Sequence, residues 1–105
     1  MKLNKTILIT GASKGIGRAI AYKLASDGYS LVLHCRSSID ELRSLSDSLE
    51  KEFSTDSHLL QFDVSDRDQS NEILENYLDK YGAPYGVVCN AGITADNVFP
   101  AMLSE

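Results

Sequence analysis

The stretch from Thr6 to Gly17 reads TILITGASKGIG and sets the pattern for the whole chain. Its first five residues are mostly apolar and rich in β-branched side chains, as expected for a strand buried on both faces. Glycines follow at positions 11, 15 and 17, and Ile16, Ile20 and Leu24 then recur at helical spacing. Glycine lets the chain turn tightly and lets a ligand approach the backbone. The stretch therefore predicts a strand, a glycine-rich turn and a helix whose first amide groups and dipole suit a phosphate.

Four short apolar runs alternate with three longer amphipathic stretches along the chain. Strands are predicted over residues 6–10, 30–35, 58–63 and 85–90. The first helix is expected to end at Gly28, and capping patterns at 38–41 and 65–68 open the second and third helices. The predicted buried faces of these two helices consist of Ile39, Leu42, Leu45, Leu49 and Phe53, and of Ile73, Leu74, Tyr77, Leu78 and Tyr81.

This alternation is typical of a doubly wound α/β fold with a parallel sheet. Right-handed crossovers place the first two helices on one face of the sheet. If the fourth strand returns beside the first, the strand order is 3-2-1-4 and the third helix lies alone on the other face. Ligands of such sheets bind where the strand order reverses, at the carboxyl ends of the strands. That point lies between Gly11, after the first strand, and Asn90, at the end of the fourth.

The composition fits one globular domain, since 43% of the 105 residues are hydrophobic and 24% are charged. No apolar run approaches the ~20 residues of a membrane helix. The first residues lack the long apolar region of a secretory signal, so we expect a cytoplasmic protein that binds no membrane. Residues 1–37 carry a net charge of +5 and residues 38–105 a net charge of −10. This split argues against nucleic-acid binding and is compatible with a local anion site near the N-terminus, with scattered solvated lysines as the alternative.

Two cysteines and two histidines offer little for a metal site. In the expected strand order Cys35 and Cys89 lie two strands apart, roughly 9–10 Å, which is too far for a disulfide. Both are therefore predicted to be free thiols packed near strand ends. His34 and His58 fall within strand patterns and are predicted to be packing or surface residues.

The glycine spacing, G-x-x-x-G-x-G, differs from both the G-x-G-x-x-G fingerprint and the triphosphate P-loop. With the preceding threonine it resembles the TGxxxGxG signature of the short-chain dehydrogenases/reductases. Three further places match that family: Arg36-Ser37 after the second strand, Asp63-Val64 after the third, and Asn90-Ala91-Gly92 after the fourth. Cys89 stands where a second asparagine is frequent. The resemblance implies a Rossmann-type fold and a nicotinamide cofactor, bound by Gly11, Ser13, Lys14, Gly15, Ile16, Gly17, Arg36, Ser37, Asp63, Val64, Asn90, Ala91 and Gly92.

Arg36 indicates which nicotinamide cofactor is preferred. Where NAD binds, an acidic residue at this position accepts hydrogen bonds from the ribose 2′-hydroxyl. An arginine instead pairs with a 2′-phosphate through forked, charged hydrogen bonds. The sequence therefore predicts NADP(H), the alternative being that Arg36 is a solvated turn residue.

Residues 90–97 look most like the 3-oxoacyl-[acyl-carrier-protein] reductases of fatty-acid synthesis, although many of those have an arginine where this chain has Ala95. The resemblance implies an oxidoreductase that uses NADPH to reduce a ketone, either a small molecule or a 3-oxoacyl thioester carried by the acyl carrier protein.

The family's proton donor is the tyrosine of a Y-x-x-x-K pair, and none of the five tyrosines here is followed four residues later by lysine. We therefore expect residues 1–105 to be the N-terminal, cofactor-binding half of a single NADP-binding domain, inactive by itself because the catalytic half is absent. Such a half has a bare sheet edge and an open apolar face, so it should be marginally stable or form a homo-oligomer. A non-enzymatic nucleotide-binding or interaction module, complete at this length, is the alternative. A methyltransferase-like domain is a third, which Arg36 opposes.

Overall fold

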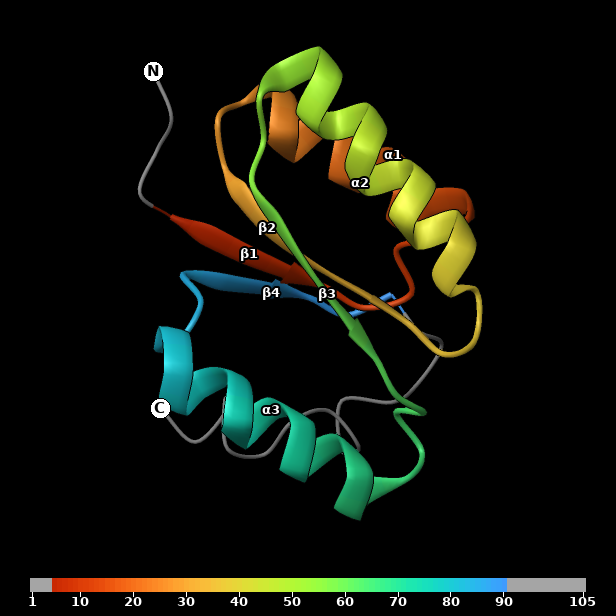
Figure 1. The fold of residues 1–105 in the computed structure, drawn as a ribbon, viewed down its shortest axis with the longest axis vertical. Coiled ribbons are helices and arrows are strands. Elements are labelled where there is room, and N and C mark those ends of the chain that lie inside the picture. Colours follow the sequence, from red (N-terminus) through yellow and green to blue (C-terminus); the bar gives the residue numbers. More distant parts are fainter. Residues whose placement is uncertain (1–4, 91–105) are drawn as a thin grey trace.

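Four parallel strands and three helices alternate along the chain in the computed structural model, which describes residues 5–90 (Figure 1). The strands are β1 (Thr6–Ile9), β2 (Ser30–Cys35), β3 (Ser57–Gln61) and β4 (Gly86–Val88). The helices are α1 (Gly15–Ser26), α2 (Ile39–Phe53) and α3 (Arg67–Tyr81). The strand order is β3-β2-β1-β4, which confirms the predicted doubly wound sheet and its reversal between β1 and β4.

Helices cover both faces of the sheet, with α1 and α2 on one face and α3 on the other, as predicted (Figure 1). Side chains alternate along a strand, so each strand supplies both layers. In β1, Ile7 and Ile9 join the core under α1 and α2, whereas Leu8 joins the core under α3. This two-sided burial is the reason that β1 and β2 read as continuous apolar runs rather than alternating ones.

Two residues of the predicted helix faces are exposed instead. Ile16 is 71% exposed because it lies in the first turn of α1, next to the glycine loop. Tyr81 is 50% exposed because it is the last residue of α3. Its ring lies 4.8 Å from that of Tyr77 and 4.3 Å from that of His58, measured between centroids, so it packs on neighbouring rings rather than in the core.

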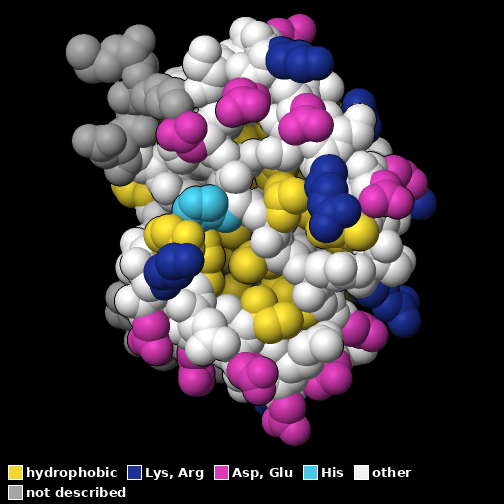
Figure 2. Space-filling model, viewed as in Figure 1, with side chains coloured by type: hydrophobic (Ala, Val, Ile, Leu, Met, Phe, Trp, Pro, Cys, Tyr) yellow, Lys and Arg dark blue, Asp and Glu magenta, His cyan; other side chains and the backbone are white. Residues whose placement is uncertain are grey.

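The two edges of the described sheet are β3 and β4. Figure 2 shows hydrophobic side chains still visible on the surface between the two helical layers.

Both cysteines are free thiols, as predicted, but only Cys35 is buried. The predicted packing of Cys89 is wrong: this residue follows the short edge strand β4 and is exposed. Within residues 5–90, no helix has the length and apolar character needed to cross a bilayer.

The two predicted helix caps differ, and this difference can be tested. Asp66 caps α3, since its side chain accepts a hydrogen bond from the Gln69 amide at 3.1 Å. Within the described part of the chain the Ser38 side chain makes no such bond at α2, so the predicted capping box does not form there. We expect Asp66→Ala to lower the free energy of unfolding by about 0.5–2 kcal/mol. Ser38→Ala should change it much less, and equal losses in urea denaturation would contradict this difference.

Candidate nucleotide-binding site

A pocket of about 390 Å³ opens at the carboxyl ends of β1, β2 and β3. Seven predicted site residues line it together: Gly11, Ser13, Lys14, Arg36, Ser37, Asp63 and Val64. Four further lining residues were not predicted: His34, Cys35, Ser38 and Ser65. A second cavity, of about 420 Å³, includes Thr6 and Ser30 at the opposite ends of the strands, where the predicted motifs contribute nothing.

The glycine loop needs glycine for two different reasons. Gly11 and Gly15 have φ angles of +62° and +58°, which residues with a side chain rarely adopt. A Cβ on Gly15 would meet no described atom within 4 Å, so the space in front of this residue is open. A Cβ on Gly17 would lie 2.3 Å from the Gly11 carbonyl oxygen and 2.7 Å from Asn90 Nδ2. Gly17 therefore permits close packing of α1 on the loop, while Gly15 leaves room for a ligand.

Asn90 lies against the loop but does not line the pocket. Its backbone amide donates to Thr10 Oγ1 at 2.7 Å, and its side-chain Nδ2 donates to the Gly11 carbonyl at 3.3 Å. The Thr10 amide donates to the Val88 carbonyl at 3.0 Å. These bonds tie the ends of β1 and β4 together at the point where the strand order reverses. Ala91 and Gly92, the other two predicted residues of this motif, lie outside the described residues.

The N-terminus of α1 is open to an anion. Among the described residues no side chain caps it, and its first turn holds no acidic residue. The first turns of α2 and α3 do hold acids, Asp40 with Glu41 and Asp68 respectively. Lys14 pairs with Glu41 at 3.8 Å, but both side chains are more than half exposed, so this ion pair contributes little. Amides, helix dipole and Lys14 together favour a negatively charged group here.

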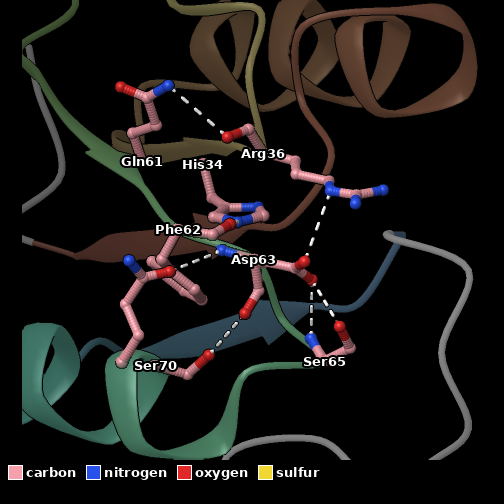
Figure 3. A network of polar contacts seen from close by, with 8 residues as sticks. His34, Arg36, Gln61, Phe62, Asp63, Ser65 and Ser70 are labelled. Carbon is pink, nitrogen blue, oxygen red and sulfur yellow. Dashed lines mark hydrogen bonds and ion pairs between the residues drawn. The ribbon is translucent and has the colours of Figure 1, made fainter.

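Arg36 and Asp63 both line the pocket and form an ion pair with each other (Figure 3). Arg36 Nε lies 3.4 Å from Asp63 Oδ2, and the terminal guanidinium nitrogens point away from this carboxylate. Asp63 also accepts bonds from the Ser65 hydroxyl at 2.7 Å and the Ser65 amide at 2.9 Å. These two bonds, and then Arg36, lower the pKa of Asp63 below its ordinary value of 3.8. Asp63 is thus charged at neutral pH and orients Arg36 without occupying its outer nitrogens.

His34 is the main residue that sequence reasoning missed, because a histidine in an apolar strand is usually a packing residue. It does pack, with its ring centroid 4.2 Å from that of Phe62, yet it also bonds to the glycine loop through Nδ1. Its position in the sequence could have indicated this role, since His34 is a polar residue two positions before Arg36, on the strand next to the glycine loop.

The sequence model of the short chain dehydrogenase family matches residues 5–105 of this chain. The chain belongs to the short-chain dehydrogenase family. This confirms the resemblance drawn from the four motifs. A curated relative of this short-chain dehydrogenase, the 3-oxoacyl-[acyl-carrier-protein] reductase FabG of Aggregatibacter actinomycetemcomitans, is 47% identical over 103 residues. That match covers 98% of this chain, which spans 42% of the relative's length.

Solved structures agree with the fold. An alcohol dehydrogenase from the archaeon Thermococcus sibiricus, complexed with 5-hydroxy-NADP, is 38% identical with a TM-score of 0.73, covering 79% of this chain and 35% of that one. The L-sorbose reductase of Gluconobacter frateurii, complexed with NADPH and L-sorbose, is 31% identical with a TM-score of 0.77, covering 90% and 35%. These similarities support the Rossmann-type architecture of this short-chain dehydrogenase.

Proposed function

We propose that this short-chain dehydrogenase binds NADP(H) in the pocket at the carboxyl ends of β1, β2 and β3. The proposal rests on two anion-binding features at this site. The N-terminus of α1 is uncapped, and the terminal nitrogens of Arg36 point away from Asp63. The first amides of α1 are also accessible to a phosphate, because a Cβ on Gly15 would meet no described atom within 4 Å. The solved relatives with 5-hydroxy-NADP and NADPH give independent support.

Each part of the pocket suits a different part of this cofactor. Arg36 and Ser37 would hold the 2′-phosphate, since a guanidinium pairs with phosphate through two parallel hydrogen bonds. Lys14 and the first amides of α1, including those of Gly15 and Ile16, would hold the pyrophosphate. Asp63 and Val64 would contact the adenine. When bound, NADPH would supply a hydride for carbonyl reduction, and these residues would bind and orient its adenosine and pyrophosphate parts.

We further propose that residues 1–105 are the cofactor-binding half of a longer ketone reductase, acting on a 3-oxoacyl thioester of the acyl carrier protein. The 47% identity to a 3-oxoacyl-[acyl-carrier-protein] reductase of which this chain spans 42% supports this substrate class. The absence of a Y-x-x-x-K pair from the 105 residues means that this segment supplies no tyrosine for proton donation. The association of copies remains a prediction. The intact mass of the protein in its source organism tests whether these residues belong to a longer chain.

Calorimetric titration of the chain with NADPH and with NADH tests the cofactor proposal. We expect NADPH to bind more tightly by about 10- to 100-fold, the effect of one well-placed charged hydrogen-bonding group. Equal affinities would contradict the role of Arg36. Failure of both cofactors to bind would contradict the proposed site as a whole.

A further inference from the structure

His34 connects three parts of the candidate site. The residue is 1% exposed and stands near the end of β2, in the otherwise largely apolar sequence SLVLHC. Its Nδ1 lies 3.1 Å from the Gly11 amide nitrogen, and its Nε2 lies 2.7 Å from the Phe62 carbonyl oxygen. Its own carbonyl accepts a bond from the Ala12 amide at 2.9 Å. One residue therefore joins the glycine loop, the end of β2 that leads to Arg36, and the turn that leads to Asp63.

The two ring contacts require one neutral tautomer. The Gly11 amide can only donate, so Nδ1 must carry a lone pair. The Phe62 carbonyl can only accept, so Nε2 must carry the proton. The tautomer is thus assigned from its partners. A protonated ring would carry N–H groups at both nitrogens and would place a donor against the Gly11 donor.

Gly11 is held at both ends of its backbone. His34 accepts from its N–H, and Asn90 Nδ2 donates to its carbonyl oxygen at 3.3 Å. Gly17 packs against that same carbonyl, so the position of Gly11 also determines where α1 begins. A change in the protonation of His34 Nδ1 is therefore expected to shift the backbone amides of the glycine loop and of the start of α1.

We propose that neutral His34 is a positioning residue for the nucleotide site, which holds the glycine loop in place, and that protonation of its ring releases the loop and weakens cofactor binding. This proposal takes from the proposed function only the identity of the ligand, NADP(H). The contact between His34 and Gly11 is independent of it.

The surroundings favour the neutral ring at pH 7. Burial lowers the pKa of His34 below its ordinary value of 6.5, and the Phe62 carbonyl and the charge of Asp63 oppose this shift. Lys14 on the loop and Arg36 after β2 line the same pocket, and Cys35, the next residue of β2, has a thiol pKa raised by burial and stays neutral at pH 7. Because the pKa of His34 is lowered in the folded state, the contribution of its neutral ring to stability is fully present above the unfolded-state pKa of 6.5. This contribution is lost as the pH falls through the lower folded-state pKa.

Two substitutions separate the two ends of the ring. His34→Asn places an amide oxygen near the position of Nδ1 and keeps an acceptor for Gly11. His34→Gln reaches toward Phe62 and leaves the partly buried Gly11 amide without its His34 acceptor. At pH 8 we expect NADPH to bind about 10-fold more weakly to His34→Gln, and within about 3-fold of wild type to His34→Asn.

The pH profile is measured as the NADPH dissociation constant from pH 8 to pH 5.5. The 2′-phosphate itself titrates near pH 6, so the decisive quantity is the difference between wild type and His34→Asn, which lacks an ionising ring. Wild type should weaken progressively more than His34→Asn once the pH falls below 6.5, and by less than about 10-fold at pH 5.5, because a ring pKa below 6.5 limits the protonated fraction there. Identical profiles, or a His34→Gln variant that binds like wild type, would overturn the proposal.

NMR of the cofactor-free chain keeps the test independent of NADPH. The ¹⁵N shifts of the His34 ring should report the Nε2–H tautomer, and the Gly11 amide should titrate with the same midpoint as the ring. If wild type binds no NADPH while Gly11 still follows His34, the proposed function fails and the loop contact stands. If the Gly11 amide does not move when His34 titrates, the positioning role is refuted.

Discussion

Replacing Gly17 with alanine is expected to destabilise the fold by at least about 1–3 kcal/mol and to abolish measurable NADPH binding. Helix propensity alone predicts the opposite sign, since alanine is favoured over glycine within a helix by about 1 kcal/mol. The structure reverses this because the new Cβ would lie 2.3 Å from the Gly11 carbonyl oxygen, which is backbone and has little room to move. Either α1 or the glycine loop must shift, and the loop lines the pocket up to Lys14, the residue directly before α1. Urea denaturation and NADPH calorimetry measure the two effects.

Gly82→Ala is the matched control. Gly82 lies at the end of α3 with a φ of +82°, and a Cβ there would meet no described atom within 4 Å. Its substitution should cost about 1–3 kcal/mol through backbone strain and leave NADPH affinity unchanged. If Gly17→Ala were as stable as wild type and bound NADPH normally, the close packing of α1 on the loop would not exist in solution.

Reversing the charge at Arg36 should reverse the cofactor preference. Arg36→Asp removes the guanidinium and places a second carboxylate beside Asp63, which now lies 3.4 Å from the Arg36 Nε. We expect NADPH binding to weaken by about 100-fold, the loss of charged hydrogen bonds to the 2′-phosphate. NADH binding should persist or improve, since an acid at this position accepts hydrogen bonds from the ribose 2′-hydroxyl.

Arg43→Asp controls for the change in net charge. Arg43 is an exposed residue of α2 that pairs with Asp40 at 3.7 Å and does not line the pocket. The Arg43→Asp substitution should leave the ratio of NADPH to NADH affinity within about 2-fold of wild type, because exposed charges far from a ligand are screened by salt. An unchanged NADPH preference in Arg36→Asp would refute the proposed 2′-phosphate contact.

The fold could be predicted because its determinants are local patterns. Continuous apolar runs define β1 and β2, and right-handed crossovers decide the faces on which the helices lie. Helix ends were less predictable. Ile16 and Tyr81 continue the apolar spacing, but at the first and last turns a helix extends past the surface it packs on, so both are exposed. Ser38 has the right sequence for a capping box but makes no capping bond with its side chain among the described residues.

The candidate site could be predicted where the motif follows a strand end. The glycine loop, Arg36 and Asp63 are each next to one, so strand order alone brings them together. His34 contacts a residue far away in sequence, and Ser65 bonds to Asp63 within a turn. No single sequence motif encodes either contact. The Gly11–His34 bond spans 23 positions and the Gly11–Asn90 bond spans 79, so both depend on the finished sheet.

The central claim is that the pocket at the carboxyl ends of the strands binds a 2′-phosphorylated nucleotide. The most direct test is an NMR titration of the ¹⁵N-labelled chain with adenosine 2′,5′-bisphosphate. We predict saturable shifts in the amides of Arg36, Ser37 and Val64, with those of the second cavity, such as Glu50 and Thr55, unaffected. Shifts confined to that second cavity, or no saturable shift at all, would contradict the claim.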